Sequence, residues 1–205
     1  MGFFEELPDP AVPERHPSPP WIGPPGNEAP VAVPLQLVVG RSDRAAVLLG
    51  GLRVYSIGIE LDATILLRDE PSDFHFFDPL HQHPGQPKDT VLRLAVVCAD
   101  GSQGEAMRFP PREEAGRVLT PNGGGGGQGR WTHRLWLWPL PPPGAVDVVC
   151  AWPAFGIGEA WTSFDAGPVL EAAKHVEQLW PENAEPSGGG GSVTMTRMYG
   201  TGDGA

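Results

Sequence analysis

The residues most able to bind a metal ion stand close together in one stretch, DFHFFDPLHQH, which runs from residue 73 to residue 83. Imidazoles and carboxylates together suit Zn²⁺, Fe²⁺ or Mn²⁺. His81 and His83 are two positions apart, so they project to the same side of an extended chain. The pattern keeps open a metal-dependent enzyme or metal sensor, with a divalent metal held by His75, His81, His83 and Asp78.

A solvated loop between two strands is the simpler interpretation of the same stretch, and we favour it. A cupin site also uses a His-x-His pair, but it needs a glutamate a few residues later on a strand, whereas residues 84–87 read PGQP. Short histidine clusters are weak evidence for a metal until their geometry is known. Three phenylalanines would anchor such a loop: Phe74, Phe76 and Phe77.

A second group that could bind a ligand is the aromatic run RWTHRLWLW at residues 130–138, which follows five glycines. A phosphate-binding loop needs Lys and then Ser or Thr after its glycines, and neither follows here. We therefore interpret the glycines as a long, flexible hairpin loop. We expect the tryptophans in the core, because aromatic side chains dominate core energetics. Carbohydrate binding through exposed Trp136 and Trp138 is the weaker alternative.

Nucleophilic catalysis has no support in the sequence. The G-x-S-x-G turn that presents a catalytic serine is absent. Cys98 and Cys150 are the only cysteines, and both fall on predicted core faces, where a thiol is inert. We expect two buried thiols, with a disulfide or a shared metal as the alternatives.

The charge balance excludes some classes of partner. The chain has 14 Lys and Arg against 25 Asp and Glu, a formal charge of −11. A negative surface repels phosphate backbones and anionic lipids, so we expect neither nucleic-acid nor membrane binding. The first residues lack the basic and apolar regions of a signal peptide. We therefore expect a cytoplasmic protein.

The middle of the chain has the period-two alternation of half-buried strands. From residue 55 to residue 67 the odd positions are apolar, and Ser56 and Gly58 mark a turn in which Gly58 can take a positive φ. Asp100-Gly101 is a second turn signal. The expected strands are 46–54, 59–68, 91–99, 131–138, 145–152 and 160–164.

These elements predict an all-β fold, an antiparallel immunoglobulin-like β-sandwich with one C-terminal helix. Pro168 begins the helix, whose apolar residues recur at helical spacing as far as Trp180. The domain plan has three parts. Residues 1–30 are a Pro-rich flexible arm, residues 31–181 are the sandwich with its closing helix, and residues 182–205 are a Gly-rich disordered tail.

Three segments, GGGGGQGRW, LWLWPLPPPG and VVCAWPAFGI, resemble segments of a group of cytosolic actinobacterial proteins that have no assigned activity. The shared patterns are GRW, WxWPLPPPG and CxWPAxGI, and the likeness spans residues 36–181. The resemblance implies a bacterial cytosolic protein. It carries over no catalytic residue.

The first functional hypothesis is a non-enzymatic binding or protein-interaction module with a protein partner and no cofactor. It depends on the all-β pattern, the missing catalytic motifs and the proline-rich arm, which suits grooves on a partner. A fold alone does not define a function. The metal-dependent enzyme or sensor and the carbohydrate-binding protein remain the alternatives.

Overall fold

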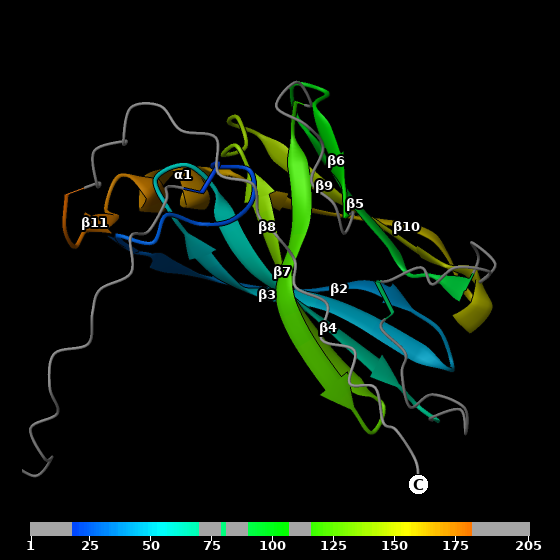
Figure 1. Ribbon diagram of the computed structural model, residues 1–205. Helices are drawn as coiled ribbons and strands as arrows, with labels where there is room; N and C mark the ends of the chain where they lie inside the picture. The colour runs from blue at the N-terminus through cyan, green and yellow to red at the C-terminus, as the bar shows by residue number, and fades with distance from the viewer. Residues whose placement is uncertain (1–17, 70–78, 81–89, 107–115, 182–205) are drawn as a thin grey trace, which may run out of the picture. The chain divides into compact units, whose positions relative to one another are not determined.

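The computed structural model describes residues 18–69, 79–80, 90–106 and 116–181 (Figure 1). Within them the chain is mostly β, with antiparallel sheets packed together and one short α-helix near the C-terminal end. The five-stranded sheet has the order β2 (Val31–Arg41), β3 (Ala45–Val54), β4 (Ile59–Leu67), β8 (Arg130–Trp138), β7 (Val118–Gly127). The four-stranded sheet has the order β10 (Ile157–Asp165), β9 (Ala145–Trp152), β5 (Arg93–Cys98), β6 (Gln103–Glu105).

The core lies between the inner faces of these two sheets. On each strand the apolar residues of one parity point inward, which is why the predicted alternation identified the strands. One sheet contributes Val47, Leu61, Ile65 and Leu135, and the other contributes Leu94, Val96, Val148 and Cys150. The sheets meet at one side through contacts between β2 and β10. At the other side a parallel bridge joins Ala106 to Leu119.

The glycine run forms a strand, so the expected flexible loop is wrong. Residues 124–127 pair with β8, and Gly126 lies opposite Trp131. A Cβ on Gly126 would overlap the carbonyl oxygen of Arg130 and would lie 2.6 Å from Cδ1 of Trp131. The missing side chains let β7 approach the neighbouring strand closely, a role that glycine composition alone does not reveal.

The turns follow local backbone chemistry. Gln128 and Gly129 connect β7 to β8 with φ of 54° and 76°, as in a two-residue type I′ hairpin. The turn between β3 and β4 lies where Ser56 and Gly58 predicted it. Gly58, however, does not take the expected positive φ. Its Cβ would lie 2.6 Å from the Trp136 ring, so glycine is needed there for close packing.

The helix is shorter than its sequence pattern predicts. Helix α1 spans Gly167–Ala173, with Pro168 in its first turn as expected. The next residues form β11 (Glu177–Gln178), which pairs with β1 (Glu28–Ala29). Backbone pairing with residues near the N-terminal end thus replaces the last helical turns. Leu179 and Trp180, expected on the buried stripe, are 49% and 51% exposed.

Residues 18–30 belong to the folded body, although the sequence placed them in the flexible arm. Together with residues up to 181 they form one compact unit. Trp21 packs against Trp138, with ring centroids 6.0 Å apart. The carboxylate of Glu28 accepts hydrogen bonds from the backbone N–H and the hydroxyl of Ser56. Prolines therefore do not prevent this segment from packing, because its contacts come from side chains, carbonyls and the strand residues Glu28 and Ala29, which are not prolines.

No helix in the described part of the chain is long and apolar enough to span a bilayer.

Candidate functional site

The predicted metal ligands His75, Asp78, His81 and His83 lie outside the described residues. Among the residues that the structure does describe, no three His, Cys, Asp or Glu side chains come together as a metal site would require. The metal hypothesis therefore stays a prediction.

The two tryptophans proposed for carbohydrate binding are not an exposed platform. Trp136 is fully buried, and its Nε1 donates a hydrogen bond to the carbonyl oxygen of Pro20 at 2.9 Å. Its ring also makes an edge contact with Tyr55, with centroids 5.6 Å apart. Trp138 is half-buried beneath Trp21. Trp136 is buried, as the core interpretation expects, but it lies opposite Glu60 on the outer face of the five-stranded sheet, covered by Pro20. Its expected exposure in the carbohydrate alternative is wrong.

Both cysteines are free and buried, as expected. Burial raises the pKa of the Cys150 thiol to about 12. Burial also raises the pKa of Cys98, while the nearby Arg117 opposes that shift. A thiol with a raised pKa holds little thiolate at neutral pH, so neither cysteine suits nucleophilic catalysis.

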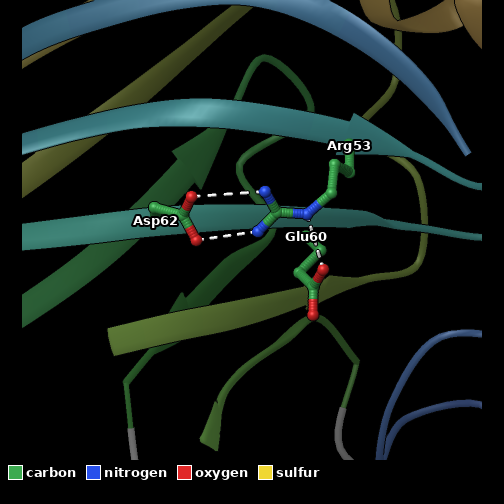
Figure 2. Close-up of polar contacts among 3 residues, drawn as sticks. All are labelled: Arg53, Glu60 and Asp62. Carbon is green, nitrogen blue, oxygen red and sulfur yellow. Dashed lines mark hydrogen bonds and ion pairs between the residues drawn. The ribbon is translucent and has the colours of Figure 1, made fainter. Parts of the chain in front are cut away.

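Arg53, Glu60 and Asp62 form an ion-pair network (Figure 2). Their chain neighbours Leu52 and Leu61 point into the core, so the network lies on the outer face of the five-stranded sheet. Nε of Arg53 donates to Glu60 at 2.7 Å, and the two terminal nitrogens donate to Asp62 at 3.2 and 2.7 Å. Hydrogen bonding to Asp62 raises the pKa of Arg53 further, while partial burial opposes it and Glu60 adds to the rise. Because an arginine does not lose its proton in proteins, this network suits strand positioning rather than proton transfer.

The most exposed tryptophan, Trp161, lies on the outer face of the four-stranded sheet. Its side chain is 56% exposed. The strand register places it opposite Val149, and Val149 opposite Ala95. Residues directly opposite on paired strands share a face, so the three form one cross-strand row. We call the row and its half-buried neighbours the Trp161 strip: Trp161, Val149, Ala95, Val97 and Ala151.

The rim of the Trp161 strip is mostly acidic. Glu159 accepts a hydrogen bond from Nε1 of Trp161 at 2.9 Å, and Asp147 accepts one from Ser163. Glu105 pairs with Arg93 at 3.1 Å. Within the described residues the rim therefore has one guanidinium, and its carboxylates are Glu105, Asp147, Glu159 and Asp165.

A second surface feature is a hollow of about 280 Å³ at the turn between β2 and β3. Arg41, Arg44 and Arg68 line it. The sequence did not predict this grouping, since residues 44 and 68 meet only through the pairing of β3 with β4. The outward position of Trp161 could be predicted from the sequence, because Trp161 and Ser163 alternate with the inward residues of a predicted strand.

No protein-family model matches the sequence, and comparisons with curated proteins and with solved structures find no significant match. The resemblance to actinobacterial cytosolic proteins therefore stays a prediction.

Proposed function

We propose that the chain is a non-enzymatic protein-interaction module, built on an immunoglobulin-like sandwich and acting in the cytoplasm, that docks a protein partner on the Trp161 strip. The observation that supports this most is the 56% exposure of Trp161 in a row of apolar side chains. Contiguous exposed apolar surface commonly marks an interaction site. Tryptophan is also among the residues that most often dominate binding energy at interfaces.

The sheet provides a rigid platform for such contacts. Trp161 lies on β10, the edge strand, while Val149 lies on β9 in the interior of the sheet. Val149 and Ala95 lie on strands paired on both sides, and β10 is held by its pairing with β9, so little order has to be gained on binding. A surface that is already ordered loses less entropy when a partner docks.

The rim indicates the chemistry of the partner. Its four carboxylates outnumber the single guanidinium of Arg93, so a partner with an apolar centre and basic surroundings would be complementary. Such charges mainly direct the encounter and disfavour wrong partners, while the apolar centre contributes most of the affinity.

Site-specific photocrosslinking in cells tests the proposal. A photoreactive amino acid replaces Ser163, beside the strip, and in a matched control it replaces Lys174, exposed at the C-terminal end of α1. We expect one defined adduct from position 163, its loss when Trp161→Ala is added, and no such adduct from position 174. Equal adducts at both positions, or an adduct that survives Trp161→Ala, would contradict docking on the strip.

A carbohydrate could stack on the same indole, with Glu159 accepting a hydrogen bond from a sugar hydroxyl. Tryptophan fluorescence measured against a glycan panel distinguishes a carbohydrate ligand from a protein partner. A saturable change that Trp161→Ala removes would favour the carbohydrate alternative over a protein partner.

A further inference from the structure

The turn between β2 and β3 is tightly organised around Ser42. The backbone N–H groups of Arg44 and Ala45 each donate to Oγ of Ser42 at 3.1 Å. Oγ in turn donates to the carbonyl oxygen of Phe155 at 2.6 Å, which fixes the turn to the connection between β9 and β10. The backbone N–H of Arg68 donates to the carbonyl oxygen of Arg44 at 2.9 Å. These bonds fix the backbone next to the hollow that Arg41, Arg44 and Arg68 line.

Two of the guanidiniums are oriented by neutral groups. Nη1 of Arg44 donates to the carbonyl oxygen of Ala154 at 2.8 Å, and its Cζ lies 5.0 Å from the centre of the Phe155 ring. Nη1 of Arg68 donates to the carbonyl oxygen of Asp43 at 3.2 Å. Carbonyls and rings hold a guanidinium in position without cancelling its charge.

The ion pairs among the described residues involve other cations, namely Arg53, Arg93, Lys174 and His175. Three arginines and one aspartate, Asp43, are among the residues that line the hollow, which gives these four a formal charge of +2 (3 − 1). Asp69 follows Arg68 in the chain and is not among the residues that line the hollow. On a chain of net charge −11 this is a concentrated positive surface.

The floor of the hollow is apolar. The strand register aligns Arg41, Ala46, Leu66 and Arg130 as one row across the outer face of the five-stranded sheet. Ala46 and Leu66, in the middle of that row, line the hollow together with Arg41. A ligand that fits would place an anionic group among the guanidiniums and an uncharged body over these two side chains.

We propose that this hollow, which we call the arginine hollow, binds the phosphate group of a small phosphate monoester whose uncharged part lies on Ala46 and Leu66. The forked guanidinium matches phosphate oxygens with paired hydrogen bonds, and several forks around one site suit a dianion. A hollow of about 280 Å³ has room for a small molecule. The site lies on the five-stranded sheet and is independent of the Trp161 strip.

Calorimetric titration of the full chain with phenyl phosphate at low ionic strength tests the proposal, with inorganic phosphate and succinate as comparison ligands. We expect saturable 1:1 binding of phenyl phosphate, tighter than that of inorganic phosphate, and weaker binding of succinate. Arg44→Gln and Arg68→Gln should each weaken binding about tenfold, since one charged hydrogen bond is lost. Arg134→Gln, an exposed arginine of the same sheet outside the hollow, should leave it unchanged.

The Arg44→Gln variant also loses the contact with Phe155. Its melting temperature is therefore measured with and without phenyl phosphate, to separate a loss of stability from a loss of binding. Arg68→Gln provides an independent test. Loss of binding in Arg134→Gln equal to that in Arg68→Gln would overturn the proposal, because the effect would then be general charge. Binding of succinate as tight as that of phenyl phosphate, or no saturable binding of phenyl phosphate, would also overturn it.

Discussion

Trp136 and Pro20 are joined by a hydrogen bond of 2.9 Å from the indole Nε1 to the carbonyl oxygen, although 116 residues separate them in the chain. A buried indole N–H that lost this acceptor would be left without the partner that burial requires. Residues 18–30 are therefore part of the folding unit, and any boundary at residue 30 cuts through packed structure.

We predict that a chain starting at residue 31 is less stable than one starting at residue 18. The shorter chain exposes Trp136, loses the contact of Trp21 with Trp138, and loses the pairing of β1 with β11. We expect a cost of about 3 kcal/mol, typical of one large buried side chain. Thermal melting should show a midpoint about 6–12 °C lower. Equal midpoints would show that the segment contributes nothing to the fold.

Gly126→Ala should destabilise the protein, while Gly125→Ala serves as its control. A Cβ at position 126 would lie 2.5 Å from Cα of Trp131, whereas a Cβ at position 125 meets nothing within 4 Å. We expect about 1–3 kcal/mol lost at position 126, as in an overpacked core, and a change within about 0.5 kcal/mol at position 125. Urea unfolding midpoints measure both. Similar midpoints for the two variants would contradict the close pairing of β7 with β8.

Arg53→Met should remove the counter-charge of the buried Glu60. The Arg53 side chain is 31% exposed. We therefore expect a destabilisation of about 3 kcal/mol, the low end of the range for breaking a buried ion pair. Adding Glu60→Gln should restore at least about 1 kcal/mol of the free energy of unfolding, because a neutral amide then replaces the buried carboxylate. The matched control is Arg93→Met, whose exposed pair with Glu105 should be worth less than about 1 kcal/mol. A double-mutant cycle with no coupling would contradict the network.

Cys150 should resist alkylation in the folded protein. Its pKa of about 12 leaves about one thiolate in 10⁴ thiols at pH 8, whereas the ordinary thiol value is 9.0. The folded state thus holds this proton more tightly than the unfolded state, so the group stabilises the fold fully below pH 9 and that contribution is lost between pH 9 and 12. Iodoacetamide labelling at pH 8, with and without urea, tests whether Cys150 resists alkylation in the folded protein. Rapid labelling of Cys150 without urea would contradict its burial.

How much of this structure the sequence predicts depends on whether local pattern or long-range pairing decides each element. Alternation predicts β4 and β9 almost residue by residue, because each has one face in the core. The same alternation does not predict β7, since glycines show no alternation and only the neighbouring β8 makes a strand of them. The helical stripe is misleading after Ala173, because pairing of residues 177–178 with β1 competes with the helix.

The candidate sites likewise differ in whether local pattern or long-range pairing decides them. Trp161 could be placed on an outer face from its strand alone. The arginine hollow could not be predicted, because Arg44 and Arg68 are joined by backbone pairing between β3 and β4. The sequence could not predict that Trp136 is more buried than Trp138, because the residues that cover them, 18–22, are remote in the chain.

The affinity of the purified partner for variants of the two exposed tryptophans is the most direct test of the proposed docking surface. Trp161 and Trp180 are 56% and 51% exposed, so Trp180→Ala removes a similar exposed ring away from the strip. For the protein captured at position 163, we predict that Trp161→Ala raises the dissociation constant at least about 30-fold, as expected when a dominant interface residue is truncated. Trp180→Ala should change it less than about threefold, and both variants should melt within a few degrees of the parent chain. Equal effects of the two substitutions, or full affinity in Trp161→Ala, would contradict the Trp161 strip as the binding surface.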